Sequence, residues 1–265
     1  MTLHQARDEG FFLIHSITKE PKESHFSIHM HNDYEIFCFV SGNARYMVEG
    51  RVWRLEYGSL LLMRPGETHK LLLDGPEPYE RYVINFTPEV LPAELRSSLL
   101  APFHDRPLGE ENFYSPSRFG SLTPLALFEA MCNADGDPVR IRSYLSALLS
   151  SVLLDEAEKQ IVPDPQSLGA EMVDFVNLHL CDPVTLPMLV EHFHLSVSQI
   201  NRIFRSVTGT TVGRYCHAKR LLRARQLISA GMGAQEAAQS CGFSCYSSFF
   251  RLFKKRFGFS PSNEK

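Results

Sequence analysis

Between residues 28 and 86, hydrophobic residues occur in short runs separated by turn residues. The runs are EIFCFV, ARYMVEG, RVWRL, SLLLM, HKLLL and RYVINF. Gly42-Asn43, Glu49-Gly50 and Gly58 stand between them, and residues of these types favour turns. Many short β-rich segments at this spacing predict a small barrel or sandwich.

After Pro92 the chain becomes irregular and then helical. Over residues 139–157 the apolar positions follow the i, i+3, i+4, i+7 spacing of one helix face. A stripe of this kind usually forms core, but on a helix that leads into a second domain it is also a plausible dimer surface, and we predict that role. Pro163 and Pro165 cannot continue the helix, so we place the domain boundary between residues 160 and 161. The stripe comprises Ile141, Tyr144, Leu145, Leu148, Leu149, Val152 and Leu153.

The residues beyond this boundary carry helix signals and no credible strand. Thr185 is expected to cap a helix over residues 186–193. Ser196 and Gln199 have the capping-box spacing for a second helix, which ends before Gly209. Two helices joined by so short a turn predict a helix-turn-helix.

The second helix of this pair has an apolar face and a polar face. Positions three and four apart share a side, which groups Val197, Ile200, Phe204 and Val207. The polar side chains opposite them can hydrogen-bond base edges and phosphates, although they could equally form a solvated face. They are Ser198, Gln199, Asn201, Arg202 and Arg205.

The same unit then occurs a second time. A helix over about residues 212–229 ends at Gly231, AQEAAQSC forms a small-residue helix, and Gly242 provides the turn. Ser244 is expected to cap a last helix, CYSSFFRLFKKRF, which Gly258 closes. Its predicted inner face holds Phe249, Leu252, Phe253 and Phe257, and its outer face holds Tyr246, Ser247, Arg251, Lys254 and Lys255.

The helix between the two units fits the geometry and charge of a DNA-binding module. About 18 residues make it roughly 27 Å long, so two recognition helices could enter successive major-groove segments about 34 Å apart. It carries Arg214, Lys219, Arg220, Arg223 and Arg225. The net charge is −3, yet residues 166–265 hold 12 Lys+Arg against 6 Asp+Glu, whereas residues 1–165 hold 15 against 24. A basic part joined to an acidic part suggests a polyanion-binding module attached to a domain with another task.

The rest of the composition limits the class of protein. No apolar run approaches the length of a membrane span, and the start MTLHQARDEGFF is no secretory signal, so we expect a cytoplasmic protein without a membrane partner. The six cysteines form no CxxC pair, and we expect buried, reduced thiols. GxSxG, P-loop and GxGxxG motifs are missing, so we predict no catalytic residues and no enzyme.

The C-terminal pattern resembles the AraC/XylS family of bacterial transcription regulators. The resemblance rests on LPMLVEHFHLSVSQINRIFRSVTGTTVGRYCHAKRLLRARQLI followed by AAQSCGFSCYSSFFRLFKKRFGFSP. It implies base-facing roles for Ser198, Gln199, Asn201 and Arg202, and in the second unit for Tyr246, Ser247, Ser248 and Arg251. The family usually continues SPxxY-R, whereas this chain has Ser260-Pro261-Ser262-Asn263-Glu264-Lys265, so we expect the final packing contact of the domain to be missing.

The N-terminal part resembles the cupins. His29, His31, Glu35 and Gly42 match the first cupin motif, and Gly58 with PGETH at residues 65–69 resembles the second more loosely. Many AraC-type regulators carry such a barrel as their effector-binding domain. The resemblance therefore implies that this part binds an effector.

The histidines allow two interpretations. Side chains alternate along an extended strand, so the odd-numbered His29, His31 and Glu35 should point the same way, and His69 could join them. Three imidazoles and a carboxylate suit Zn, Fe, Ni or Mn and leave an open coordination position. Together with Arg45, Tyr46 and Trp53, the same residues could instead line a polar, aromatic pocket for a metabolite such as a sugar. We favour the metal-free effector pocket, and so expect no cofactor.

These observations predict an α+β protein with two domains. Residues 1–160 should form a cupin-like β-barrel with a helical dimerisation segment, and residues 161–265 an all-α domain with two helix-turn-helix units. We expect a homodimer that binds double-stranded DNA sequence-specifically in response to a small-molecule effector, with RNA polymerase as a partner if it activates. The alternative is a metal-dependent cupin sensor or enzyme fused to a DNA-binding domain.

Overall fold

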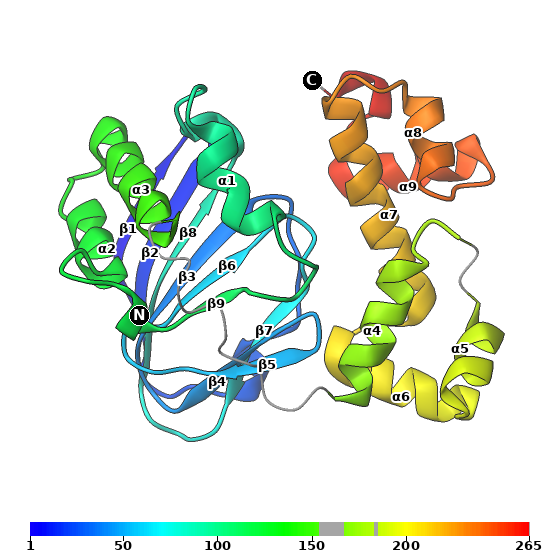
Figure 1. Cartoon of the computed structure of the whole chain (residues 1–265), viewed down its shortest axis with the longest axis horizontal. Helices are drawn as coiled ribbons and strands as arrows, with labels where there is room; N and C mark the ends of the chain where they lie inside the picture. Colours follow the sequence, from blue (N-terminus) through cyan, green and yellow to red (C-terminus); the bar gives the residue numbers. More distant parts are fainter. Residues whose placement is uncertain (154–166, 183–184, 265) are drawn as a thin grey trace. The chain divides into compact units, whose positions relative to one another are not determined.

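The computed structural model describes residues 1–153, 167–182 and 185–264. The chain divides into two compact units, Met1–Gln166 and Ser167–Lys265, which are described separately here (Figure 1). The predicted domain boundary, the linker prolines and the predicted helix end at residues 154–157 lie outside the described residues. Among the helices that the structure describes, none is long and apolar enough to cross a membrane.

The first unit contains a six-stranded and a three-stranded sheet, and every strand pair is antiparallel. In spatial order the larger sheet is β1 (Thr2–Asp8), β2 (Phe11–Thr18), β8 (Tyr79–Phe86), β3 (Tyr34–Ser41), β6 (Leu60–Met63) and β9 (Phe113–Tyr114). The smaller sheet is β5 (Arg51–Arg54), β4 (Ala44–Val48) and β7 (His69–Leu73). All six strands predicted from the hydrophobic runs are present, so this part of the fold prediction is confirmed.

Strand β3 joins two hydrophobic cores because both of its faces are buried. Its even-numbered residues Ile36 and Cys38 belong to a core shared with the helices. Its odd-numbered residues Phe37 and Phe39 belong to a second core, which includes residues of the small sheet. Glu35 has the same parity as Phe37, so its side chain lies on the side of the small sheet.

Three helices cover the other side of the large sheet. They are α1 (Arg96–His104), α2 (Pro124–Cys132) and α3 (Pro138–Leu153) (Figure 1). Short 3-10 turns lie at Glu23–His25, Pro88–Val90 and Pro116–Arg118. Thr123 caps α2 with its side chain, which accepts a hydrogen bond from the Ala126 amide, and Pro124 occupies the first helical position.

Most of the apolar stripe of α3 is core, and dimerisation through this helix stays a prediction. Five of its members are at most 2% exposed because they pack with α1, α2 and the large sheet. A side chain that is already buried in its own unit cannot also contact a second chain. The five are Ile141, Leu145, Leu148, Leu149 and Val152. A surface for dimerisation, if α3 supplies one, must use other residues.

The residues of the second unit that the structure describes form helices and one short 3-10 turn at Pro261–Asn263. The helices are α4 (Leu168–Leu178), α5 (Leu186–Phe193), α6 (Val197–Thr208), α7 (Val212–Ser229), α8 (Ala234–Ser240) and α9 (Tyr246–Phe257) (Figure 1). This confirms the all-α prediction for the C-terminal part. Helix α4, which the sequence analysis did not identify, packs against α6 and α7.

The helix caps follow the predictions in part. The capping box of α6 is present, with Ser196 and Gln199 bonding each other's backbone amides. Thr185 occupies the N-cap of α5, but its side chain makes no capping hydrogen bond. Cys245, and not Ser244, is the N-cap of α9. The Ser244 prediction was wrong because the helix begins one residue later than the serine would allow.

Gly242 forms the turn between α8 and α9 and has a φ of +78°. A Cβ at this position would overlap the carbonyl oxygen of Cys181. Glycine is therefore required here both for the left-handed backbone and for the close approach of the loop that follows α4.

We predict that Gly242→Ala destabilises the C-terminal unit by about 1 to 3 kcal/mol for the strained backbone alone, with the overlap adding to this cost. Gly213→Ala is the matched control, because a Cβ on Gly213 in α7 meets nothing within 4 Å. The control should leave stability unchanged or raise it by up to about 1 kcal/mol. Urea unfolding followed by the helical circular dichroism signal measures both. Equal midpoints for the two variants would contradict the prediction.

Candidate functional site

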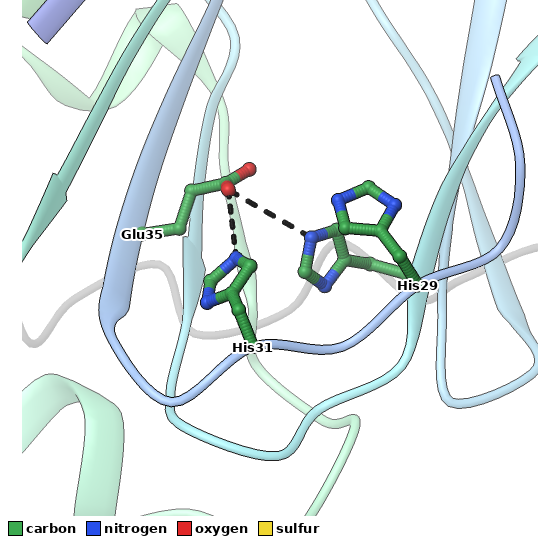
Figure 2. Close-up of side chains that lie close together, drawn as sticks. His29, His31 and Glu35 are labelled. Carbon is green, nitrogen blue, oxygen red and sulfur yellow. Dashed lines mark hydrogen bonds and ion pairs between the residues drawn. The ribbon is translucent and has the colours of Figure 1, made fainter. Parts of the chain in front are cut away.

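Four predicted ligand residues come together between the two sheets. One side-chain ligand atom from each of His29, His31, Glu35 and His69 lies within 4.8 Å of all the others. Figure 2 shows the side chains of His29, His31 and Glu35 converging on one point. The structure therefore brings together the whole set that the sequence nominated.

Strand alternation does not explain how His29 and His31 come to lie beside Glu35. Strand β3 begins only at Tyr34, so His29 and His31 belong to the segment that precedes it. An isolated antiparallel bridge positions the first histidine: the amide of His29 donates to the carbonyl of His69 at 3.2 Å, and the reverse bond measures 3.0 Å. The Gly66 amide donates to the carbonyl of His31 at 3.0 Å.

Each of the three imidazoles is oriented by a backbone carbonyl. Nδ1 of His29 lies 3.0 Å from the Ser27 oxygen, and Nδ1 of His31 lies 2.9 Å from the Asp33 oxygen. Nδ1 of His69 lies 2.9 Å from the carbonyl oxygen of Glu67. A carbonyl oxygen only accepts, so Nδ1 of each ring carries the hydrogen. Each Nε2 is then the atom left for a ligand or a second hydrogen bond.

Glu35 is the buried centre of this group. Its Oε2 lies 2.9 Å from Nε2 of His31, and it accepts a hydrogen bond from Nδ2 of Asn85 at 2.9 Å. The hydroxyl of Tyr46 donates to Oε1 at 3.4 Å. Burial raises the pKa of Glu35, but the neighbouring His69 and His31 lower it by more, so the pKa lies well below its usual value. The carboxylate is therefore ionised at neutral pH.

The histidines differ in exposure and in pKa. Burial lowers the pKa of His69 to about 4, so this ring is neutral at pH 7. Burial also lowers the pKa of His31, but its hydrogen bond to Glu35 offsets this and leaves the pKa raised. His29 is exposed and His69 is fully buried. The group thus has one end inside the unit and one end in contact with solvent.

Three further residues were predicted to line the pocket. Of these, Tyr46 contacts Glu35 and His69. Its ring stacks on that of His69 with centroids 6.2 Å apart. Trp53 lies opposite Tyr46 in the β4–β5 pairing and is buried in the same core. The prediction for Arg45 was wrong, because it neighbours Tyr46 along β4 and points to the other face, where it pairs with Asp74 at 2.7 Å.

The sequence analysis missed Asn85 and the role of Glu67. Asn85 is the one amide in the predicted strand run RYVINF, and that isolated polar residue was the available signal. The Glu67 carboxylate is fully buried and binds Arg106 Nη1 at 2.7 Å and Asn112 Nδ2 at 2.9 Å. These bonds fix the turn before β7 and with it the carbonyl that orients His69.

Helix α6 presents a mixed surface. Ile200 and Phe204 are fully buried as predicted, but Val197 is 46% exposed, because it begins the helix before the face reaches the core. Gln199 Oε1 accepts hydrogen bonds from the Ser196 amide and hydroxyl, and Asn201 Nδ2 donates to the Val197 carbonyl. Both amides thus bond within the first turns of α6. The exposed members of the predicted base-facing set are Ser198, Gln199, Arg202 and Arg205.

Helix α9 has a clearly separated apolar face and polar face. Phe249 and Phe253 are fully buried, with Leu252 and Phe257 partly buried beside them, as predicted. The opposite side exposes a row of polar and basic residues, with Ser248 half-buried at its edge. The exposed residues are Tyr246, Ser247, Arg251, Lys254, Lys255 and Arg256. Such a face can meet phosphates and base edges.

Several basic residues of α7 have structural partners. Arg220 donates to the carbonyls of Leu180, Asp182 and Gly242. Arg225 Nε donates to both carboxylate oxygens of Glu264 at 2.9 Å. This ion pair joins the last described residue of the chain to α7, whereas the expected loss of the family's aromatic contact stays a prediction. Lys219 is buried over the ring of Tyr215.

The cysteines are all free, but they are not all buried as predicted. Cys38, Cys216 and Cys241 are buried, whereas Cys245 is exposed at the start of α9. Hydrogen bonds from the Ser248 and Ser247 amides and hydroxyls lower the pKa of the Cys245 thiol to about 7. Helix N-termini have this effect on thiols because their amides stabilise the thiolate.

We predict that iodoacetamide alkylates Cys245 with a half-maximal rate near pH 7, because the thiolate is the reactive form. An ordinary thiol would need a pH of about 8.5. Rate measurements across pH, with the modified residue located by mass spectrometry, test this. Cys245→Ser should remove the fast reaction. A rate that rises only above about pH 8 would show that the amides do not stabilise the thiolate.

Comparison with known proteins identifies the family. The helix-turn-helix domain family matches residues 189–264, and the AraC-like ligand binding domain family matches residues 14–149. The uncharacterized HTH-type transcriptional regulator YfiF of Bacillus subtilis is 23% identical over 243 residues, covering 88% of this chain and 77% of YfiF. The HTH-type transcriptional activator RhaS of Escherichia fergusonii is 22% identical over 259 residues, covering 93% and 90%.

Among solved structures, the apo form of a ToxT variant from Vibrio cholerae aligns over 97% of both chains with 15% identity and a TM-score of 0.44. YfiF and RhaS are named as regulators of transcription, which agrees with the prediction of a regulator. The match to the ligand-binding family covers half of the chain, and the helix-turn-helix match covers most of the rest. The chain therefore belongs to the AraC family of transcriptional regulators and combines an AraC-like ligand-binding domain with a helix-turn-helix DNA-binding domain.

Proposed function

We propose that this regulator binds a small molecule beside Glu35, His29, His31 and His69. Its affinity for DNA changes in response. Ligand binding favours one conformation of the chain over another, and this alters which half-sites the protein occupies. One observation carries the proposal: a polar, partly solvent-exposed group of side chains lies inside an otherwise apolar sheet pair, in a chain that also holds two recognition helices.

The side chains of His29, His31, Glu35 and His69 have the properties of a site that recognises a specific small molecule. Its polar atoms converge from β3, β7, β8 and the segment before β3, and aromatic rings of Tyr46 and His69 lie against it. Burying this much polarity costs stability unless a ligand or a partner satisfies it. A hydroxylated metabolite such as a sugar fits this combination of acceptors, donors and ring faces.

The DNA-contacting roles rest on exposure and charge. Arg202 and Arg205 on α6 and Arg251 on α9 are exposed beside polar neighbours. Arginine is suited to bidentate contacts with guanine, whereas serine and tyrosine hydroxyls suit phosphates and either base edge. We assign Ser198, Arg202, Tyr246, Ser247 and Arg251 to DNA recognition, and Gln199 first to capping α6.

The proposal also concerns the oligomeric state and the protein partners, for which we name no contact surface. We propose a homodimer, which would give four recognition helices and hence a longer operator. The five fully buried residues of the α3 stripe cannot supply its interface. RNA polymerase becomes a partner if the protein activates transcription.

We predict that Arg202→Ala and Arg251→Ala each weaken operator binding by about 1 to 3 kcal/mol if the side chains contact bases. The operator would be selected from a randomised duplex library with the parent protein, and affinities measured on it and on random DNA at one salt concentration. Arg140→Ala, an exposed arginine in the first unit, is the charge-matched control. Equal losses on operator and random DNA would assign the arginines to phosphates instead.

We predict that a compound found by thermal-shift screening of sugars and other metabolites changes operator affinity about 5-fold to 150-fold. Asn85→Ala should abolish this response, because Asn85 donates to the central carboxylate. Arg45→Ala should retain it, because Arg45 lies on the far face of β4. A bound compound that leaves operator affinity unchanged would refute coupling, and loss of the response in Arg45→Ala would refute the location.

A further inference from the structure

We propose that Arg81 and Ser16 bind the carboxylate of a small organic acid, and that this acid is the effector of the regulator. The inference deepens the proposed function by naming the chemical class of the effector, and it rests on that function for the effect on DNA. Two independent observations support it. One is a cation that has no carboxylate partner, and the other is a buried hydroxyl that has no hydrogen bond.

Arg81 and Ser16 are neighbours on the inner face of the large sheet, which is the face that carries Glu35. Ser16 of β2 lies directly opposite Arg81 of β8, and Arg81 lies opposite Phe39 of β3. Phe39 packs in the core that includes the small sheet, which fixes the side to which this row points. Residues directly opposite each other in antiparallel strands share a face, with Cβ atoms about 4.5 to 5.5 Å apart. One ligand group can therefore reach both side chains.

The first observation concerns the Arg81 guanidinium. Its Cζ lies 5.2 Å from the centroid of the Tyr79 ring and 5.9 Å from that of the Phe26 ring. Burial raises the pKa of Tyr79, and the nearby charge of Arg81 lowers it by less. Arg81 forms no ion pair with any residue that the structure describes. The adjacent acid, Glu80, is engaged with His15 at 2.7 Å. Aromatic rings and one hydroxyl take up few of the five N–H donors, so donors remain for an anion.

The second observation concerns the Ser16 hydroxyl. Ser16 is 7% exposed, and its Oγ makes no hydrogen bond with the residues described in the structure. A buried hydroxyl without a partner is unfavourable unless a bound group satisfies it. A carboxylate accepts hydrogen bonds from a hydroxyl and from a guanidinium, so it would satisfy Ser16 and Arg81 together.

An apolar strip leads away from this pair along β2 and β8. Ile14 lies opposite Val83, and Phe12 lies opposite Asn85. Val83 is buried, whereas Phe12 and Ile14 are partly exposed, so the strip is accessible to a ligand. Asn85 is four residues beyond Arg81, which is about 13 Å along the strand. A molecule that is charged at one end and apolar along its body fits this order of side chains.

The charge of the site indicates a carboxylate and not a phosphate. One guanidinium and one hydroxyl match a single negative charge, and a guanidinium can hold both oxygens of a carboxylate. A phosphate monoester carries nearly two charges and three strong acceptor oxygens, and it would require more donors. The apolar strip suits the hydrocarbon body of an organic acid. The class of effector is therefore a monocarboxylic acid with an apolar body.

Arg81 also connects the site to the segment that precedes β3. The ring of Phe26, which lies near the guanidinium, packs edge-on against Tyr79 with centroids 5.5 Å apart. His29 and His31 follow Phe26 on the same segment. A carboxylate on Arg81 draws the guanidinium toward itself and changes its contact with Phe26. Binding at Arg81 would therefore be felt by the segment that carries the two histidines.

The test measures the affinity of the full-length protein for monocarboxylates by isothermal titration calorimetry. The probes are the linear acids from butyrate to octanoate, benzoate and phenylacetate, each compared with its neutral primary amide. We expect at least one acid to bind about tenfold or more tightly than its amide, because a charge-assisted hydrogen bond is stronger than a neutral one. Arg81→Gln should abolish this preference, and Ser16→Ala should weaken binding of the acid.

Arg54→Gln is the charge-matched control. Arg54 is exposed and lies opposite Arg45, whose side chain points to the outer face of β4. This variant should bind the acid as the parent does. Circular dichroism establishes that each variant is folded before its affinity is compared. If Arg81→Gln does not fold, Ser16→Ala decides, and an unchanged affinity for the acid in that variant would overturn the site.

Further results would overturn the proposal. They are no binding of any acid by the folded parent, equal binding of acids and amides, a preference that survives in Arg81→Gln, or one that is lost in Arg54→Gln. Tighter binding of phenyl phosphate than of every acid would reject the class of ligand. The proposed function fails separately. Acid binding through Arg81 without a change in operator affinity would reject only the regulation, and an operator response to a neutral compound without any acid preference would reject only this inference.

Discussion

The burial of β3 on both faces is the constraint from which the architecture of the first unit follows. Because side chains alternate along a strand, one set of β3 residues packs under the helices and the other packs against the small sheet. Glu35 belongs to the second set and is therefore a charge inside an apolar layer. Such a charge is tolerated only where hydrogen bonds and counter-charges surround it, and His31, Asn85 and Tyr46 supply them.

The second unit depends on a comparable internal clamp. Arg220 lies in the middle of α7 and binds carbonyls from the loop after α4 and from the turn before α9. A planar guanidinium can serve several acceptors at once and keeps its charge at any physiological pH. It thereby links the loop after α4, the first helix of the unit, to the turn that precedes α9.

The sequence predicted the elements with strong periodicity and failed where tertiary contacts decide. The six central strands and helices α5 to α9 follow from hydrophobic runs and capping signals. Strands β1 and β2 and helix α4 were missed, although FFLIHSIT in β2 is largely apolar and Ser167 stands at the N-cap of α4. The four ligand residues were found by motif, but strand parity explained them incorrectly, since His29 and His31 lie outside β3. Arg45 was assigned by nearness in sequence, and only the register of β4 shows that it points away.

The inward-facing cations of α7 also bear on how tightly the protein would hold any polyanion. Residues 166–265 contain 12 Lys+Arg, but Lys219, Arg220 and Arg225 are occupied by an aromatic ring, backbone carbonyls and a carboxylate. Counterion release depends on the cations that reach phosphates, not on the formal total. The salt dependence of binding by this domain should thus be shallower than its composition implies, and a larger share of its selectivity would rest on contacts that do not change with ionic strength.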